Sequence, residues 1–272
     1  MKLATLTLTL VLGLAGAARA QGPAIENGTI ARHDAPGALA PEFAALARDP
    51  ARPLWIGYAV PAQQRGGFNG CWDGQGGGRR VIPIKLEGPS ELFVLYRMEH
   101  GAVGRIQIAS PECPLDLGGL SLHWFSSVTA AASLDWLATF TATGVARGVT
   151  SSAVTAIALH GHDSVVERLI ALARDGRDRQ VRSGALFWLS QRAGARAAGT
   201  IADAAERDPD TQVKRQAVFA LSQLPKDQGV PRLIDVARSN RSGEVRKQAM
   251  FWLGQSQDPR ALAFFEDVLR AR

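Results

Sequence analysis

The feature that most constrains the fold is a stretch of eleven residues that recurs at 32-residue intervals in the C-terminal half of the chain. It reads VRSGALFWLSQ from Val181, VKRQAVFALSQ from Val213 and VRKQAMFWLGQ from Val245, and a divergent copy, VTSSAVTAIAL, begins at Val149. Its apolar residues are three and four positions apart, as on one face of a helix. A second apolar set follows each copy, so each unit is expected to contain two helices. Because one helix pair cannot bury its apolar face alone, the repeats predict a mainly α protein, an α-solenoid over residues 127–272.

Capping residues agree with this register. In each of the last three copies, a side chain that can accept a hydrogen bond from a backbone N–H lies three residues before the first Val of the copy, where an N-cap is expected. These residues are Asp178, Asp210 and Ser242. The residues expected to open the second helices are Asp163, Asp227 and Asp258.

The repeat carries a family resemblance. The segment VRKQAMFWLG has the pattern V-R-x-x-A-x-x-W-L-G and resembles a HEAT repeat of the short type found in phycobilisome-lyase-like HEAT proteins. Hydroxylases of that short class carry His-Glu metal pairs, and this sequence has none. The resemblance therefore implies the helix-pair solenoid fold and no oxygenase activity. Upstream, WIGYAVP and SPECPLDLGGL resemble the N-terminal region of exported bacterial HEAT-repeat proteins.

The first twenty residues have the layout of a cleavable secretory signal. Lys2 precedes an apolar run from Leu3 to Leu14, and the small-residue motif Ala18-Arg19-Ala20 follows. We expect cleavage near Ala20 and a periplasmic or secreted protein. No other segment approaches the roughly 20 apolar residues of a membrane-spanning helix, so no membrane span is expected.

The region between the signal and the repeats is expected to be rich in β-strands. LWIGYAV, RRVIPIKL, ELFVLYRM and GRIQIAS are short β-branched and aromatic runs bounded by Gly, Pro and Asn, and the last two suggest a hairpin across EHGAV. These runs predict a small antiparallel β-rich domain over residues 54–125. Residues 21–53, rich in Ala and Pro, are expected to form a flexible lead-in with one short helix around 41–48. An exported chain with two cysteines also predicts a disulfide between Cys71 and Cys113, with free thiols as the alternative.

The charge distribution argues against a nucleic-acid partner. The formal net charge is +6 at pH 7, but Arg and Asp alternate along the chain, as in ARDGRDRQVR. Nucleic-acid binding is indicated when basic residues cluster without acids between them. The pattern instead predicts a solvated surface of mixed sign.

Motifs for catalysis or metal binding are weak. The turn His160-Gly161-His162-Asp163 contains ligand types, but a metal site needs three or four converging groups and no partner motif is visible, so an inter-helix loop is the favoured interpretation. The Gly-rich stretch FNGCWDGQGGGRR precedes a predicted strand and lacks the helix start of a phosphate loop. A nucleophilic Cys71 would compete with disulfide pairing. The sequence contains no G-x-S-x-G and no H-E-x-x-H. We therefore expect no catalytic residues, no metal, no cofactor and no enzyme activity.

Two columns outside the expected core are candidate partner-binding residues. On the first helices an aromatic column lies almost opposite the apolar face, with an amide column one turn further on. These residues are Phe187, Phe219, Phe251, Gln191, Gln223 and Gln255. An exposed Phe row would indicate a binding surface, whereas packing against neighbouring helices would explain it without one; packing is favoured.

On the second helices Asp203, Asp235 and Asp267 form a column expected to face solvent. One interpretation is an acidic strip for a basic or hydroxyl-rich partner. The other is a set of duplicated residues paired with the arginines three or four positions on, Arg207, Arg238 and Arg270.

These observations favour a periplasmic, non-enzymatic interaction module that binds a protein partner in the cell envelope through a HEAT-repeat surface. The alternative is an enzyme or small-ligand-binding protein with a site between the β-domain and the first repeats, around Trp72, Asp73, His123 and Trp124.

Overall fold

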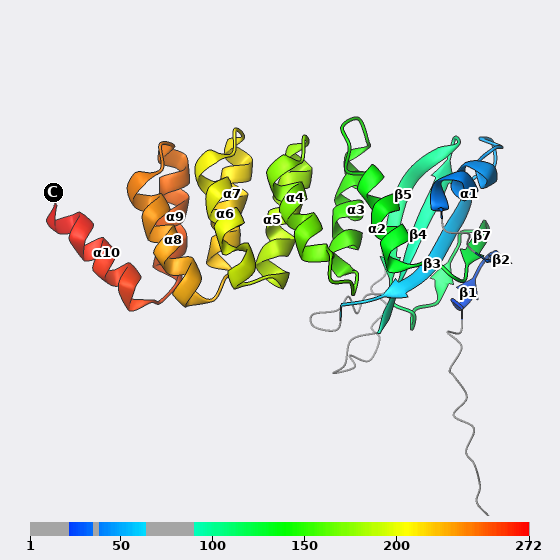
Figure 1. The fold of residues 1–272 in the computed structure, drawn as a ribbon, viewed down its shortest axis with the longest axis horizontal. Helices are drawn as coiled ribbons and strands as arrows, with labels where there is room; N and C mark the ends of the chain where they lie inside the picture. The colour runs from blue at the N-terminus through cyan, green and yellow to red at the C-terminus, as the bar shows by residue number, and fades with distance from the viewer. Residues whose placement is uncertain (1–21, 35–37, 64–89, 272) are drawn as a thin grey trace, which may run out of the picture.

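The computed structural model describes residues 22–34, 38–63 and 90–271. A strand-rich part lies at one end of an elongated molecule, and a row of helices extends from it to the C-terminus (Figure 1). The elements of the strand-rich part are β1 (Ile25–Glu26), β2 (Thr29–His33), α1 (Leu39–Leu46), β3 (Leu54–Pro61), β4 (Glu91–Glu99), β5 (Ala102–Ala109), β6 (Leu115–Asp116) and β7 (Ser121–Phe125).

The main sheet is mixed, which differs from the antiparallel domain expected. Its strand order is β2-β7-β3-β4-β5. The β4–β5 hairpin and the β3–β4 pair are antiparallel, and this confirms the predicted hairpin. However, β7 runs parallel to both β2 and β3. The expected strand at 79–86 lies outside the described residues.

The region expected to be a flexible lead-in contributes ordered elements. Strand β2 pairs with β7 so that Thr29 lies opposite Ser121, and β1 pairs with β6. Helix α1 covers part of the expected helix at 41–48. The strands have no local hydrophobic alternation, and their partners are some ninety residues away in the chain. Long-range pairing, rather than a local pattern, orders them.

Each face of the sheet is covered by a different part of the chain. One face, which includes Ile56, Tyr58 and Tyr96, belongs to a single buried cluster that continues through the helices as far as Phe264. The other face carries Trp55, Phe93 and Trp124 in a separate cluster that includes leucines of the 115–122 segment. The sheet therefore covers the N-terminal end of the helical stack, as Figure 1 shows.

The remaining helices form two ranks. The first-helix rank is α3 (Arg147–Leu159), α5 (Arg179–Arg192), α7 (Thr211–Ser222) and α9 (Gly243–Gln255). The second rank is α2 (Ala130–Thr139), α4 (Val165–Asp175), α6 (Ala195–Arg207), α8 (Lys226–Ser239) and α10 (Pro259–Arg270). These elements confirm a mainly helical protein. Within the described residues no helix is long and apolar enough to cross a membrane.

Most of the predicted helix caps are confirmed. Asp178, Asp210 and Ser242 each accept a backbone N–H from the first turn of the helix that follows, and Asp258 does the same for α10. Two second-helix caps differ: α4 begins after Ser164 and α8 after Pro225, neither with a side-chain cap.

A charged pair between α5 and the end of α6 ties neighbouring repeats together. The guanidinium of Arg182 donates to both carboxylate oxygens of Asp208 at 2.7 and 3.1 Å, and to the carbonyl of Gly176 at 2.8 Å. The two charged side chains are only 11% and 5% exposed. Bidentate geometry and the extra carbonyl bond offset the cost of removing this pair from water. The pair thus fixes α5 to the residue that ends α6, and the bond to Gly176 adds the loop after α4.

Candidate functional site

The described part of the chain offers its most distinctive surface where α7, α8 and α9 meet. Trp252 of α9 lies at the centre of this surface, with ring centroids 5.3 Å from Phe219 of α7 and 5.1 Å from Phe251 of its own helix. Its indole N–H is buried and has no hydrogen-bond partner among the described residues. Cavities that include Trp252 in their lining lie between α7, α8 and α9 and between α7 and α9. We call this surface the Trp252 groove.

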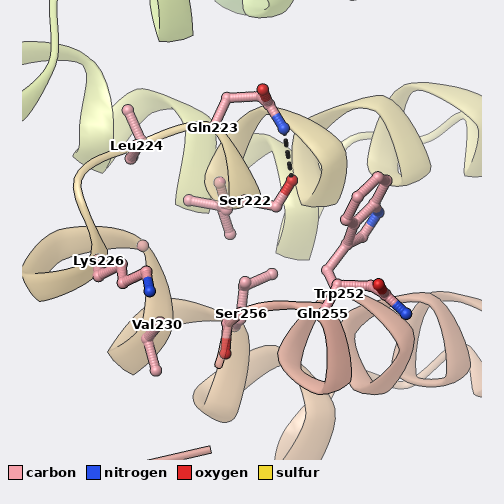
Figure 2. A pocket seen from close by; sticks show the side chains of 11 residues that line it. Ser222, Gln223, Leu224, Lys226, Val230, Trp252, Gln255 and Ser256 are labelled. Carbon is pink, nitrogen blue, oxygen red and sulfur yellow. Dashed lines mark hydrogen bonds between the residues drawn. The ribbon is translucent and has the colours of Figure 1, made fainter. Parts of the chain in front are cut away.

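The first cavity of the groove, drawn in Figure 2, has a volume of about 260 Å³. Its apolar lining comes from the ends of α7 and α8, where Leu221, Val230 and Leu233 are almost fully buried. Gly229 permits the close approach of these helices, because a Cβ there would lie 2.3 Å from the carbonyl oxygen of Leu221. The polar lining residues are Ser222, Gln223, Lys226, Gln255 and Ser256.

Hydrogen bonds orient part of this polar lining. The hydroxyl of Ser222 donates to the carbonyl of Phe219 at 2.7 Å, and the amide of Gln223 donates to the Ser222 oxygen at 3.1 Å (Figure 2). Ser190 and Gln191 repeat this arrangement one unit earlier. In α9 the serine position is Gly254, so the amide of Gln255 has no such partner. Gln255 therefore retains hydrogen-bonding capacity beside the cavity.

The second cavity, of about 390 Å³, is lined by Arg215, Glu244, Lys247, Gln248, Phe251 and Trp252. Arg215 is held in place, with one guanidinium nitrogen 2.9 Å from Glu244 and another 2.8 Å from the amide oxygen of Gln248. Lys247 forms no ion pair in the part of the chain that the structure describes. The groove thus combines aromatic surface, amides and unpaired positive charge.

The residues of the predicted Phe column differ in how far they are buried. Phe187 and Phe219 are half-buried, whereas Phe251 is 57% exposed. The difference arises because Trp252 of the following repeat lies against Phe219, while the described residues contain no further first-rank helix beyond α9. The predicted Gln column, Gln191, Gln223 and Gln255, is exposed throughout.

The predicted acidic column lies on the second rank, away from the Trp252 groove. Asp203, Asp235 and Asp267 are all exposed. Asp203 lies 3.8 Å from Arg207, and Asp267 lies 3.6 Å from Arg238. Asp203 and Asp235 share a cavity of about 780 Å³ between α6 and α8 with the basic residues Arg207, Lys214, Arg232 and Arg241. This surface has mixed charge and is not a purely acidic strip.

The alternative site between the β-domain and the first repeats is not assembled among the described residues. Adjacent residues of a strand point to opposite faces. Accordingly, Trp124 belongs to the cluster on the face remote from the helices, while the His123 ring stacks on His33, with ring nitrogens 2.9 Å apart. Trp72 and Asp73 lie outside the described residues, as does Cys71. The disulfide with Cys113, whose side chain is buried, stays a prediction.

The His160 turn forms a structural junction between the sheet and the helices. In the described residues no group of three or more His, Cys, Asp or Glu is arranged to hold a metal. The amide of Gly161 donates to the carbonyl of Pro61 at 2.7 Å, which ties the end of β3 to the turn after α3. His160 is fully buried, and His162 is exposed and bonded to Ser164.

A buried hydrogen-bond chain crosses this junction. His160 Nδ1 lies 2.7 Å from the carbonyl of Ala156 and must donate to it, so Nε2 accepts from the Ser133 hydroxyl at 2.8 Å. Tyr58 then donates to Ser133 at 2.8 Å, and Tyr96 donates to Tyr58 at 2.6 Å. Burial lowers the pKa of His160 to about 4 and raises the pKa of Tyr58 far above its usual value. The Ser–His pair resembles an activated nucleophile, but all four side chains are fully buried, and the hydrogen-bond chain joins the sheet to the helices.

The candidate residues predicted from the sequence did not include Trp252, Lys226 or Lys247. One usable signal was the basic residue four positions before the Phe in two repeats, Arg215 and Lys247, since residues at that spacing share a helix face. Another was the Trp column itself, which reads Trp188, Ala220 and Trp252.

The helix pairs and their stacked ranks form a helical solenoid, and one part of it matches a known repeat family. Residues 200–272 match the family of HEAT repeats. One solved structure to which the chain is similar is the complex of CpcE and CpcF of phycocyanin lyase from Nostoc sp. PCC7120, at 21% identity and a TM-score of 0.40. The likeness covers 52% of this chain and 89% of that chain. No curated protein sequence matches.

This comparison corrects the expected function. A periplasmic, non-enzymatic interaction module was predicted, but the similar protein belongs to a lyase, so the prediction is contradicted and is withdrawn. A solenoid fold does not by itself imply a non-enzymatic role. At this identity and TM-score the likeness transfers no activity to this chain.

Proposed function

We propose that this chain recognises a polypeptide segment of a partner protein in the Trp252 groove. The observation that carries the proposal is that two cavities on adjacent helices share Trp252, next to a Phe251 side chain that is 57% exposed. Large aromatic side chains at the centre of a pocketed surface are the residues that most often dominate protein binding. The match to HEAT repeats, residues 200–272, includes the whole groove and supports protein interaction.

The shape of the groove supports a polypeptide occupant over an isolated small molecule. The cavities, of about 260 and 390 Å³, are each small, and both are lined by Trp252. An extended peptide can place one side chain in each cavity while its backbone accepts hydrogen bonds from Gln223 and Gln255. The proposal is independent of any catalytic activity and of the compartment in which the protein acts.

The test is selection from a random twelve-residue peptide library displayed on phage, followed by affinity measurement with labelled synthetic peptides. Selected peptides should lose binding to Phe251→Ser. This variant should fold normally, because the ring it removes is mostly in solvent. The selected peptides should bind with unchanged affinity to the triple variant Asp203→Asn, Asp235→Asn, Asp267→Asn, whose substitutions lie on the second rank. Failure to select any peptide, or equal binding to wild type and Phe251→Ser, would refute the proposal.

A further inference from the structure

The Trp252 groove has an excess of positive charge. Its two cavities are lined by three cationic side chains, Lys226, Arg215 and Lys247, and by a single carboxylate, Glu244. Arg215 pairs with that carboxylate at 2.9 Å. Lys226 and Lys247 are exposed, and neither forms an ion pair within 4 Å in the described part of the chain; Asp258 attracts Lys226 only over a longer distance. One unpaired ammonium group therefore lines each of the two cavities.

This excess distinguishes the groove from the larger cavity that contains part of the acidic column. The cavity between α6 and α8 contains four basic side chains, Arg207, Lys214, Arg232 and Arg241, but also three carboxylates, Asp203, Glu206 and Asp235. Most of its charge is therefore balanced within the cavity.

Apolar side chains line the same two cavities as the lysines. Leu221 and Val230 of the first cavity and the indole of Trp252 provide a pocket for one bulky side chain. Exposed Phe251 extends this surface into the second cavity. The amides of Gln223 and Gln255 can donate to backbone carbonyls or to carboxylates.

Resting on the proposed function, we infer that the segment bound in the Trp252 groove is acidic and carries a bulky apolar residue between its carboxylates. The apolar residue enters the cavity beside Trp252, and carboxylates on either side of it pair with Lys226 and Lys247. Because both ammonium groups are in solvent, they contribute mainly to association rate and to discrimination against basic segments. Salt should weaken binding for the same reason.

The experiment uses three labelled twelve-residue peptides whose affinities are measured by fluorescence anisotropy at low and high salt. The first has Glu and Asp on both sides of a central Trp, the second has Lys in place of every acidic residue, and the third keeps the acids but has Ala in place of Trp. We expect the first to bind at least about tenfold more tightly than either of the others, and to weaken as salt is raised.

The protein variant that tests the charge is Lys226→Gln with Lys247→Gln. This variant should bind the acidic Trp peptide about tenfold more weakly than wild type does. Its melting temperature should be unchanged, since each lysine is exposed and forms no ion pair. The matched control is Lys214→Gln, which removes the same charge from α7 in the cavity on the other rank and should have no effect.

The outcomes separate this inference from the proposed function. If the Lys peptide binds as well as the acidic peptide, or the double variant binds the acidic peptide as tightly as wild type does, the inference is wrong. The proposed polypeptide site would still be supported if the selected library peptides fail to bind Phe251→Ser. If a twelve-nucleotide single-stranded DNA competes as well as the acidic peptide and the Ala peptide binds equally, the groove recognises charge alone and the inference is overturned. If neither these peptides nor the library yields a binder, both fail.

Discussion

Acid should destabilise the junction between sheet and helices through one buried imidazole, that of His160. The side chain is fully buried, with Nδ1 donating to the carbonyl of Ala156 and Nε2 accepting from Ser133. Protonation would place a second N–H at Nε2, where the serine hydroxyl now donates, and a charge in a site without a carboxylate partner among the described residues. His162, Arg192 and Arg168 are close enough to add repulsion.

The magnitude follows from the pKa of His160. Burial is the main cause that lowers it from 6.5 to about 4 in the folded protein. The unfolded chain therefore binds more protons between these two values, and the free energy of unfolding must fall as the pH falls through this window. The stabilising effect of the neutral imidazole is complete above pH 6.5. By pH 4 the loss should reach about 3 kcal/mol, at about 1.4 kcal/mol per pKa unit.

The assay is urea denaturation followed by circular dichroism at several pH values from 7 to 4, on wild type and on His160→Gln. Other groups titrate in both proteins, including His123, whose pKa is lowered by burial and by His33, so their contributions cancel in the comparison. Between pH 7 and pH 4, the free energy of unfolding of His160→Gln should fall by about 3 kcal/mol less than that of wild type. Tyr96→Phe, which removes the far end of the hydrogen-bond chain but keeps the imidazole, should retain the wild-type pH dependence. Parallel pH profiles for wild type and His160→Gln would refute the reasoning.

Further predictions concern the repeats and the cysteines. Gly229→Ala should destabilise the protein by about 1–3 kcal/mol because its Cβ would overlap a backbone oxygen, whereas Gly199→Ala, with nothing within 4 Å of its Cβ, should stabilise it by about 0.5–1 kcal/mol; urea denaturation that ranks the two equally would contradict this. Asp208→Ala should cost about 3 kcal/mol in the same assay because it leaves a largely buried guanidinium unpaired, and a cost below about 1 kcal/mol would show that the pair is solvated. Peptide mapping without reduction should recover Cys71 linked to Cys113, and alkylation of both thiols in the unreduced, unfolded protein would exclude the bond.

The helical part of the fold was readable from the sequence because its determinants are local. Apolar spacing marks one face of each helix, and the cap residues Asp178, Asp210 and Ser242 act within three residues of their own positions. The β4–β5 hairpin was readable for the same reason, since its strands are adjacent in the chain. Propensity and capping operate over a few residues, so a single sequence displays them.

The strand pairing and the buried polar chain required the tertiary structure. Nothing within residues 29–33 indicates a strand, because its partner β7 lies some ninety residues away. The same holds for His160, which was predicted only to lie in an inter-helix loop. Burial against β3, β4 and α2, through Tyr58, Tyr96 and Ser133, instead determines its environment.

The candidate site was only partly predictable from the sequence. The aromatic and amide columns were identified from their spacing, and two of their members, Gln223 and Gln255, line the cavity of Figure 2. Equivalent positions nevertheless differ in exposure: Phe219 packs beside Trp252, while Phe251 is 57% exposed. Sequence spacing determines which side of a helix a residue occupies, but only the neighbouring helix decides whether that side is covered, because burial depends on contacts between repeats and not within one.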